Sequence, residues 1–119
     1  MKVAIRNVGN VAVLDVSGEV DLYSSTHLRE ALLNSMQTGG QTVLVNMTEV
    51  RYVDSSGIAT LVEGLQLSRQ TQSRFGLYGL RSNARSVLEL ARLHKVFSIY
   101  ADEGEALEKI ASAAPFSGL

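Results

Sequence analysis

Strand-like and helix-like apolar patterns alternate along this chain, and the alternation constrains the fold more than any other feature. Strands that alternate with helices are joined by right-handed crossovers, which align the strands in one sheet and pack the helices on its faces. The sequence therefore predicts an α/β fold with a four- or five-stranded mixed sheet, mostly parallel, and about four helices. In such folds a functional site is expected in the loops at the carboxyl ends of the strands.

The expected strands begin with a hairpin. Apolar residues alternate with polar ones on both sides of Gly9-Asn10, a dipeptide typical of turns. The continuous apolar run Val43–Val45 is typical of a central strand buried on both faces. Two further strands are expected over Phe75–Leu80 and Val96–Tyr100.

Each expected helix carries residue types that favour a helix start. These starts are Ser24–Thr26, the stretch Asp54–Gly57, Ser82 as a cap, and Asp102 with Glu105 as a capping box. Gly39-Gly40 closes the first helix and Pro115 the last. With 119 residues, 45% of them hydrophobic, the chain is long enough for one core and too short for two. We expect one domain over residues 1–114 and a short tail over 115–119.

Composition excludes several classes of function. The 11 Lys and Arg residues nearly balance the 12 Asp and Glu residues without a charged block, so nucleic acid and anionic membranes are poor partners. Cysteine is absent, which fits a cytoplasmic location, and no run approaches the ~18 apolar residues needed for membrane insertion. His27 and His94 are isolated and no phosphate-binding loop motif is present. We therefore expect neither metal nor cofactor, and a protein that is not an enzyme.

The tetrapeptide Asp54-Ser55-Ser56-Gly57 is the strongest candidate site. Alone it is a weak signal, because Asp and Ser are common at helix starts and Gly relieves a tight turn. Its surroundings are more specific. They comprise Val13–Asp21 leading into Leu28–Leu32, then Val43–Val45, Tyr52–Ala59, Val87–Leu90, Val96-Phe97 and Glu105–Leu107. In the order and spacing of these segments the chain resembles the STAS domain family of anti-sigma factor antagonists, over nearly its whole length.

The resemblance implies a bacterial partner-switching role in transcription regulation. The family's phosphorylated serine directly follows the Asp, which makes Ser55 the expected acceptor and Ser56 the less favoured one. In members that work this way, an anti-sigma factor that is also a serine kinase phosphorylates this serine, and a PP2C-type phosphatase removes the phosphate. Only the unmodified form binds the anti-sigma factor. The resemblance also implies that Asp21, Asp54, Ser55, Ser56 and Gly57 contact this partner.

Elementary electrostatics agrees with such a switch. Unpaired N–H groups and the helix dipole at a helix start stabilise an added phosphate by about 0.3–1 kcal/mol, so the fold should tolerate it. The added charge lies beside Asp54 and, we expect, near Asp21, so it should repel the partner. A second interpretation of Asp21, as an acid that only forms its own loop, stays open.

Three residues depart from the family pattern. Asn46 stands where many members have Asp, while Ala59 and Arg92 stand where many have Gly. We expect Ala59 to be small enough for close helix packing and Asn46 to suit a strand end. Each departure could alter the partner surface, so the partner's identity stays open.

Two other functions remain open. A STAS module can also be an accessory subunit of an ABC-type membrane transporter without a phosphorylation cycle, and Ile58–Gly64 is compatible with that surface. A small enzyme or nucleotide-binding domain is the third interpretation, and it would require binding or turnover of ATP or GTP by the purified chain.

Overall fold

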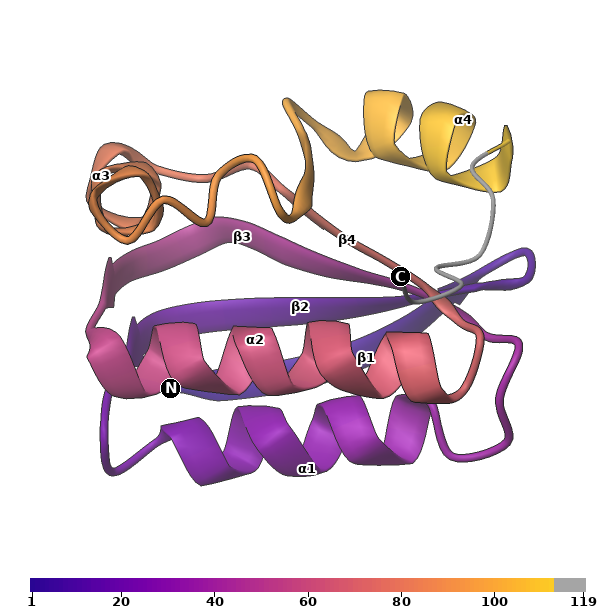
Figure 1. Cartoon of the computed structure of the whole chain (residues 1–119), viewed down its shortest axis with the longest axis horizontal. Helices are drawn as coiled ribbons and strands as arrows, with labels where there is room; N and C mark the ends of the chain where they lie inside the picture. The colour runs from indigo at the N-terminus through magenta and orange to yellow at the C-terminus, as the bar shows by residue number, and fades with distance from the viewer. Residues whose placement is uncertain (113–119) are drawn as a thin grey trace.

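A computed structural model of the chain describes residues 1–112. The expected helix end at Pro115 and the tail over 115–119 lie outside the described residues. The described residues form a five-stranded sheet in the order β1-β2-β3-β4-β5, with β1 antiparallel to β2 and the other neighbours parallel (Figure 1). The strands are β1 (Lys2–Val8), β2 (Val11–Val20), β3 (Thr42–Val53), β4 (Arg74–Tyr78) and β5 (Ser98–Tyr100). The predicted α/β class, opening hairpin and mixed sheet are confirmed.

The helices cover the two faces of this sheet unequally. They are α1 (Ser25–Ser35), α2 (Ser55–Gln70), α3 (Ser82–Leu90) and α4 (Glu103–Ser112). Figure 1 shows α1 and α2 side by side on one face, α4 on the other, and α3 beside the end of β3 that runs into α2. The buried residues of α3, Ala84 and Leu88, belong to the same core cluster as those of α1 and α2, whereas those of α4 belong to a second, smaller cluster. None of the helices in this part of the chain is long and apolar enough to cross a membrane.

The predicted central run is buried on both faces, as expected. Val43 and Val45 belong to the larger core cluster, with residues of α1 and α2 such as Leu28, Leu32 and Leu61. Leu44 points the other way and packs in a smaller cluster with side chains of α4 and of the strands around it. Because adjacent residues of a strand face opposite sides, one continuous apolar run serves two cores.

Strand lengths differ from the prediction at three places. β3 extends to Val53, well beyond the expected run, while β4 ends at Tyr78 because Gly79 turns the chain at φ +72°. β5 contains only Ser98–Tyr100. Val96 and Phe97 precede it in a turn, where both of their N–H groups donate to the Leu93 carbonyl, at 2.9 and 3.2 Å.

Of the expected helix caps, Asp102 agrees with the structure and Ser82 does not. Asp102 accepts from the Glu105 N–H at 2.9 Å, as predicted, and Glu105 accepts from the N–H of Ala101, one residue before the cap, at 2.6 Å, so α4 begins with a capping-box-like pair. The expectation for Ser82 is wrong. Arg81 occupies the N-cap position with extended backbone, and Ser82 is already the first helical residue.

Arg6 links α4 to the sheet through two ion pairs. Its guanidinium contacts Asp15 on β2 and Glu103 on α4, each at 2.5 Å, and the Tyr78 hydroxyl donates to the same Glu103 carboxylate at 2.8 Å. The Arg6 hydrogen bonds hold the pKa of both carboxyls below their ordinary values, and burial raises the pKa of Tyr78. Asn46 completes this network by donating to Asp15 at 2.8 Å. It lies within β3, so the expectation that it ends a strand is wrong.

Candidate functional site

The carboxyl ends of β2 and β3 meet at the edge of the sheet where the tetrapeptide lies. Val20 and Val53 are partners in the parallel register, and each is followed by an aspartate, Asp21 and Asp54. The Asp54 N–H donates to the Val20 carbonyl at 3.2 Å. The register therefore brings the two predicted loops together at the edge expected for a site in this fold.

Asp54 caps α2. Its backbone is extended, at φ −100° and ψ −173°, and one carboxylate oxygen accepts from the Ser56 N–H at 2.9 Å and the Gly57 N–H at 3.1 Å. The sequence predicts unpaired N–H groups here that would receive a phosphate. Two of them are already occupied by Asp54, so a phosphate on Ser55 would instead lie beside a carboxylate.

Ser55 is the first residue of α2 and is exposed. Its hydroxyl makes no hydrogen bond within the described part of the chain, so it is free to approach another molecule. Ser56 is half-buried, and its carbonyl accepts from the Thr60 hydroxyl at 3.1 Å. The geometry therefore presents the Ser55 hydroxyl to solvent more openly than that of Ser56.

Gly57 is required for close packing and not for an unusual backbone angle. A Cβ atom at this position would lie 2.7 Å from Val53 Cγ1, 2.8 Å from the Val20 carbonyl oxygen and 2.9 Å from Val20 Cγ1. Its φ lies outside the left-handed region, so the expected role of relieving a tight turn is wrong. The absence of a side chain allows α2 to begin directly against the ends of β2 and β3.

Asp21 organises its own loop. Its Oδ1 atom accepts from the N–H groups of Tyr23 and Ser24 and from the Ser24 hydroxyl, each at 3.0 Å, and these bonds lower the pKa of Asp21. Ser24, expected as a helix cap, makes no side-chain cap bond to α1. The β2–β3 register brings Asp21 near Asp54–Gly57, which we call the acceptor turn. Asp21 makes no hydrogen bond to this turn within the described part of the chain.

Besides Asn46, the chain departs from the family pattern at Ala59 and Arg92. Ala59 is exposed one helical turn after Ser55. Arg92 adopts a left-handed backbone with φ +59°, which glycine adopts without steric cost.

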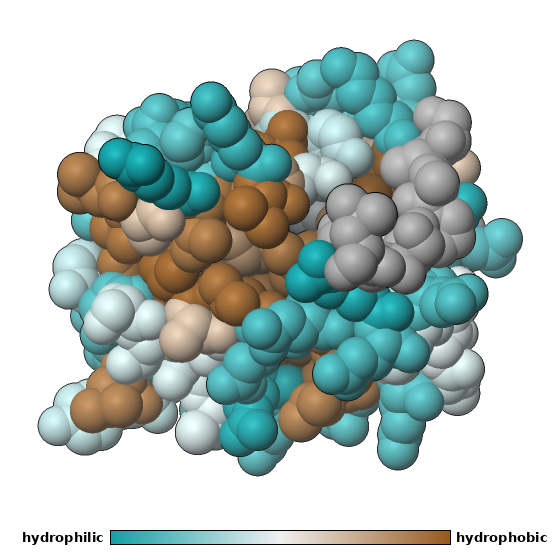
Figure 2. Space-filling model, viewed as in Figure 1, coloured by the Kyte–Doolittle hydropathy of each residue, from teal (hydrophilic) through white to brown (hydrophobic). Residues whose placement is uncertain are grey.

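Exposed apolar side chains flank both aspartates in the sequence, and the sequence patterns did not predict them. Leu22 and Tyr23, in the β2–α1 loop, are 65% and 87% exposed, and Tyr52, near the end of β3, is 45% exposed. A strand pattern does not show which face is covered, so the exposure of Tyr52 could not be predicted from the sequence. Leu22 and Tyr23 lie outside any periodic segment. That position is the one sign in the sequence that these two side chains are exposed. On another face, Figure 2 shows apolar side chains gathered between α2 and α3.

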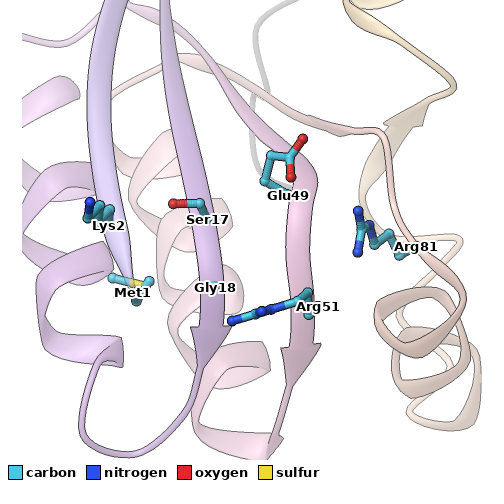
Figure 3. A pocket seen from close by; sticks show the side chains of 7 residues that line it. All are labelled: Met1, Lys2, Ser17, Gly18, Glu49, Arg51 and Arg81. Carbon is cyan, nitrogen blue, oxygen red and sulfur yellow. The ribbon is translucent and has the colours of Figure 1, made fainter.

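An open hollow of about 400 Å³ lies on the sheet face opposite α1 and α2 (Figure 3). It is lined by Met1, Lys2, Ser17, Gly18, Glu49, Arg51 and Arg81, and thus by none of the predicted site residues. No three Asp, Glu or His side chains of residues 1–111 are grouped so that they could hold a metal ion.

Comparison with known proteins identifies the family. The profile of the STAS domain matches residues 2–106. The chain belongs to the STAS domain family. This confirms the resemblance seen in the sequence, and a STAS domain occupies nearly all of the described residues.

Relatives and solved structures agree with that assignment. The anti-sigma-B factor antagonist of Listeria monocytogenes is 33% identical over 90 residues, which cover 76% of this chain and 79% of that protein. The crystal structure of an anti-sigma factor antagonist from Mycobacterium paratuberculosis superposes with a TM-score of 0.84 at 22% identity, covering 93% of this chain and 94% of the other. The phosphorylated form of the Bacillus cell fate determinant SpoIIAA superposes with a TM-score of 0.73 at 20% identity, covering 92% and 99%. The STAS fold is thus shared across the chain.

Proposed function

We propose that this STAS domain is an anti-sigma factor antagonist that binds an anti-sigma factor with serine kinase activity while Ser55 is unmodified. Phosphorylation of Ser55 then releases it, and a PP2C-type phosphatase restores binding. The observation that carries the proposal is the exposed Ser55 hydroxyl at the start of α2, which makes no hydrogen bond to any other described residue. The names of the relatives support the role, and a relative in fold, SpoIIAA, has a phosphorylated form.

The surface around Ser55 suits a protein partner. Leu22, Tyr23 and Tyr52 offer exposed apolar area, and aromatic side chains supply much of the energy in protein interfaces. Asp21 and Asp54 add negative charge at the same edge, which favours a basic partner surface. Ser55, Ser56 and Gly57 complete the proposed contact region.

Phosphorylation should act on the interface and leave the fold intact. The phosphate adds nearly two negative charges beside Asp54, whose carboxylate already takes the N–H groups of Ser56 and Gly57. The phosphate therefore projects into the contact region. Juxtaposed like charges can cost several kcal/mol, and even ~2.8 kcal/mol is a hundredfold in affinity.

Calorimetric titration with the cognate anti-sigma kinase tests this function. Ser55→Ala should abolish labelling by ATP and keep binding, whereas Ser55→Asp should weaken binding while melting within a few degrees of wild type. Ser98→Asp is the matched control, because Ser98 is an exposed serine at the amino end of edge strand β5, away from Ser55. Equal affinity of all forms would overturn the switch and favour a transporter subunit. A collapsed melting temperature for Ser55→Asp would show that Ser55 is only structural.

The proposed role involves no catalysis by this chain. Purified protein alone should not hydrolyse ATP or GTP, since any nucleotide chemistry belongs to the kinase. Turnover that survives repurification and disappears on a single substitution would overturn this part of the proposal.

A further inference from the structure

The part of β3 that leads to the acceptor turn has a strand neighbour on one side only. β4 pairs with Thr42–Asn46 and then stops, whereas β3 continues to Val53 alongside β2. At Gly79 the chain turns away into α3, and a Cβ atom there would clash with Thr48 Cγ2. The backbone groups of β3 beyond Asn46 that face this side therefore need partners other than a strand.

Side chains at the start of α3 supply those partners. Arg81 Nε donates to the Thr48 carbonyl at 2.9 Å, and the Val53 N–H donates to Asn83 Oδ1, also at 2.9 Å. Figure 1 shows α3 beside the end of β3 that runs into α2. Val53 is 1% exposed, so without Asn83 its N–H would be buried and unpaired.

These bonds fix the backbone directly before the acceptor serine. The Val53 N–H is held by α3, and the next N–H along the chain, that of Asp54, is held by the Val20 carbonyl of β2. Ser55 follows at once. The backbone before Ser55 is thus held from two sides, by β2 through the Val20 carbonyl and by α3 through the side chain of Asn83.

We propose that Asn83 is a positioning residue for phosphorylation of Ser55: its side-chain oxygen holds the end of β3 so that the hydroxyl is presented in one fixed geometry. This inference rests on the proposed function. Asn83 bonds to the backbone of Val53, so its contribution passes through the backbone of Val53 and Asp54.

Substitutions of Asn83 can remove its hydrogen bond to the Val53 N–H without weakening α3. Asn83→Ala removes the acceptor while raising helix propensity, so α3 itself is not weakened. Asn83→Asp keeps an acceptor oxygen and suits the first turn of a helix. Ser86→Ala is the matched control, because Ser86 is an exposed polar residue on the same helix.

Amide hydrogen exchange measured by NMR tests the anchoring. Loss of one net hydrogen bond of about 1 kcal/mol corresponds to about a fivefold change in an equilibrium. Asn83→Ala should therefore lower the protection of the Val53 amide about fivefold relative to that of Val45 in mid-strand, while Asn83→Asp and Ser86→Ala leave the ratio unchanged. An unchanged ratio in Asn83→Ala, or an equal fall at both amides, would overturn the inference.

Steady-state labelling of the same variants by the purified cognate anti-sigma kinase tests the functional consequence. Asn83→Ala should lower kcat severalfold at an unchanged KM, and Asn83→Asp should restore it. An unchanged kcat, or a loss confined to KM, would overturn the positioning role. A wild-type protein that the kinase does not label would instead overturn the proposed function, and the Val53 exchange ratio would still decide whether Asn83 anchors the turn.

Discussion

Replacing Gly57 by alanine tests whether close packing fixes the acceptor turn. The new methyl group would lie under 3.0 Å from three atoms, and one of them, the Val20 carbonyl oxygen, is backbone that already accepts from Asp54. Rotating a side chain cannot relieve that contact. Overpacking of this kind costs about 1–3 kcal/mol, against a helix-propensity gain of up to about 1 kcal/mol.

We therefore expect Gly57→Ala to lose about 1–2 kcal/mol of unfolding free energy, or about 4–8 °C in melting temperature. Urea unfolding and a thermal melt measure the loss, and the backbone amide shifts of Asp54–Gly57 should move with it. Gly104→Ala is the matched control, since it is also in a first helical turn but its Cβ would meet nothing nearer than 3.6 Å. It should be neutral or stabilising. A Gly57→Ala variant as stable as Gly104→Ala would refute the packing argument.

Three further predictions concern substitutions of single residues. Asp54→Ala should lose about 1 kcal/mol in urea unfolding because it removes the cap of α2, whereas Ser56→Ala should change little; equal losses would contradict the capping role. Arg92→Gly should gain about 1 kcal/mol by relieving a left-handed backbone, and a loss would show that the Arg92 side chain itself stabilises the fold. Arg6→Ala should lower the melting temperature most at neutral pH. Arg6 lowers the pKa of Asp15 and Glu103, so its stabilisation is present above their ordinary values and is lost as the pH falls below about 4. A difference independent of pH would contradict this assignment.

The sequence predicted those features that depend on local pattern. The start of α2 was visible because an apolar strand pattern changes to helical spacing directly after Asp54, a preferred capping residue. The length of β3 could not be predicted from the sequence. Register shifts opposite Asp15–Ser17 and Gly18–Glu19 interrupt its alternation, and β4 covers only its first part, so its second half mixes buried and exposed residues without a clear period.

The site was predictable to a similar extent. The acceptor turn is one continuous stretch, so Asp54 and Ser55 could be chosen from the sequence. Asn83 could not, since it bonds to a backbone N–H 30 positions away, and a backbone group has no sequence signature. The two interpretations of Asp21 also needed coordinates, because a carboxylate that bonds to its own loop has the same residue type as one that faces a partner.

The dissociation constant of the wild-type protein for its anti-sigma factor, measured before and after stoichiometric phosphorylation at Ser55, tests the central claim most directly. Mass spectrometry first verifies that one phosphate is present and that it lies on Ser55. The account predicts a dissociation constant raised at least about a hundredfold, equivalent to about 2.8 kcal/mol, and restored by phosphatase treatment. Equal dissociation constants for the two forms would contradict it.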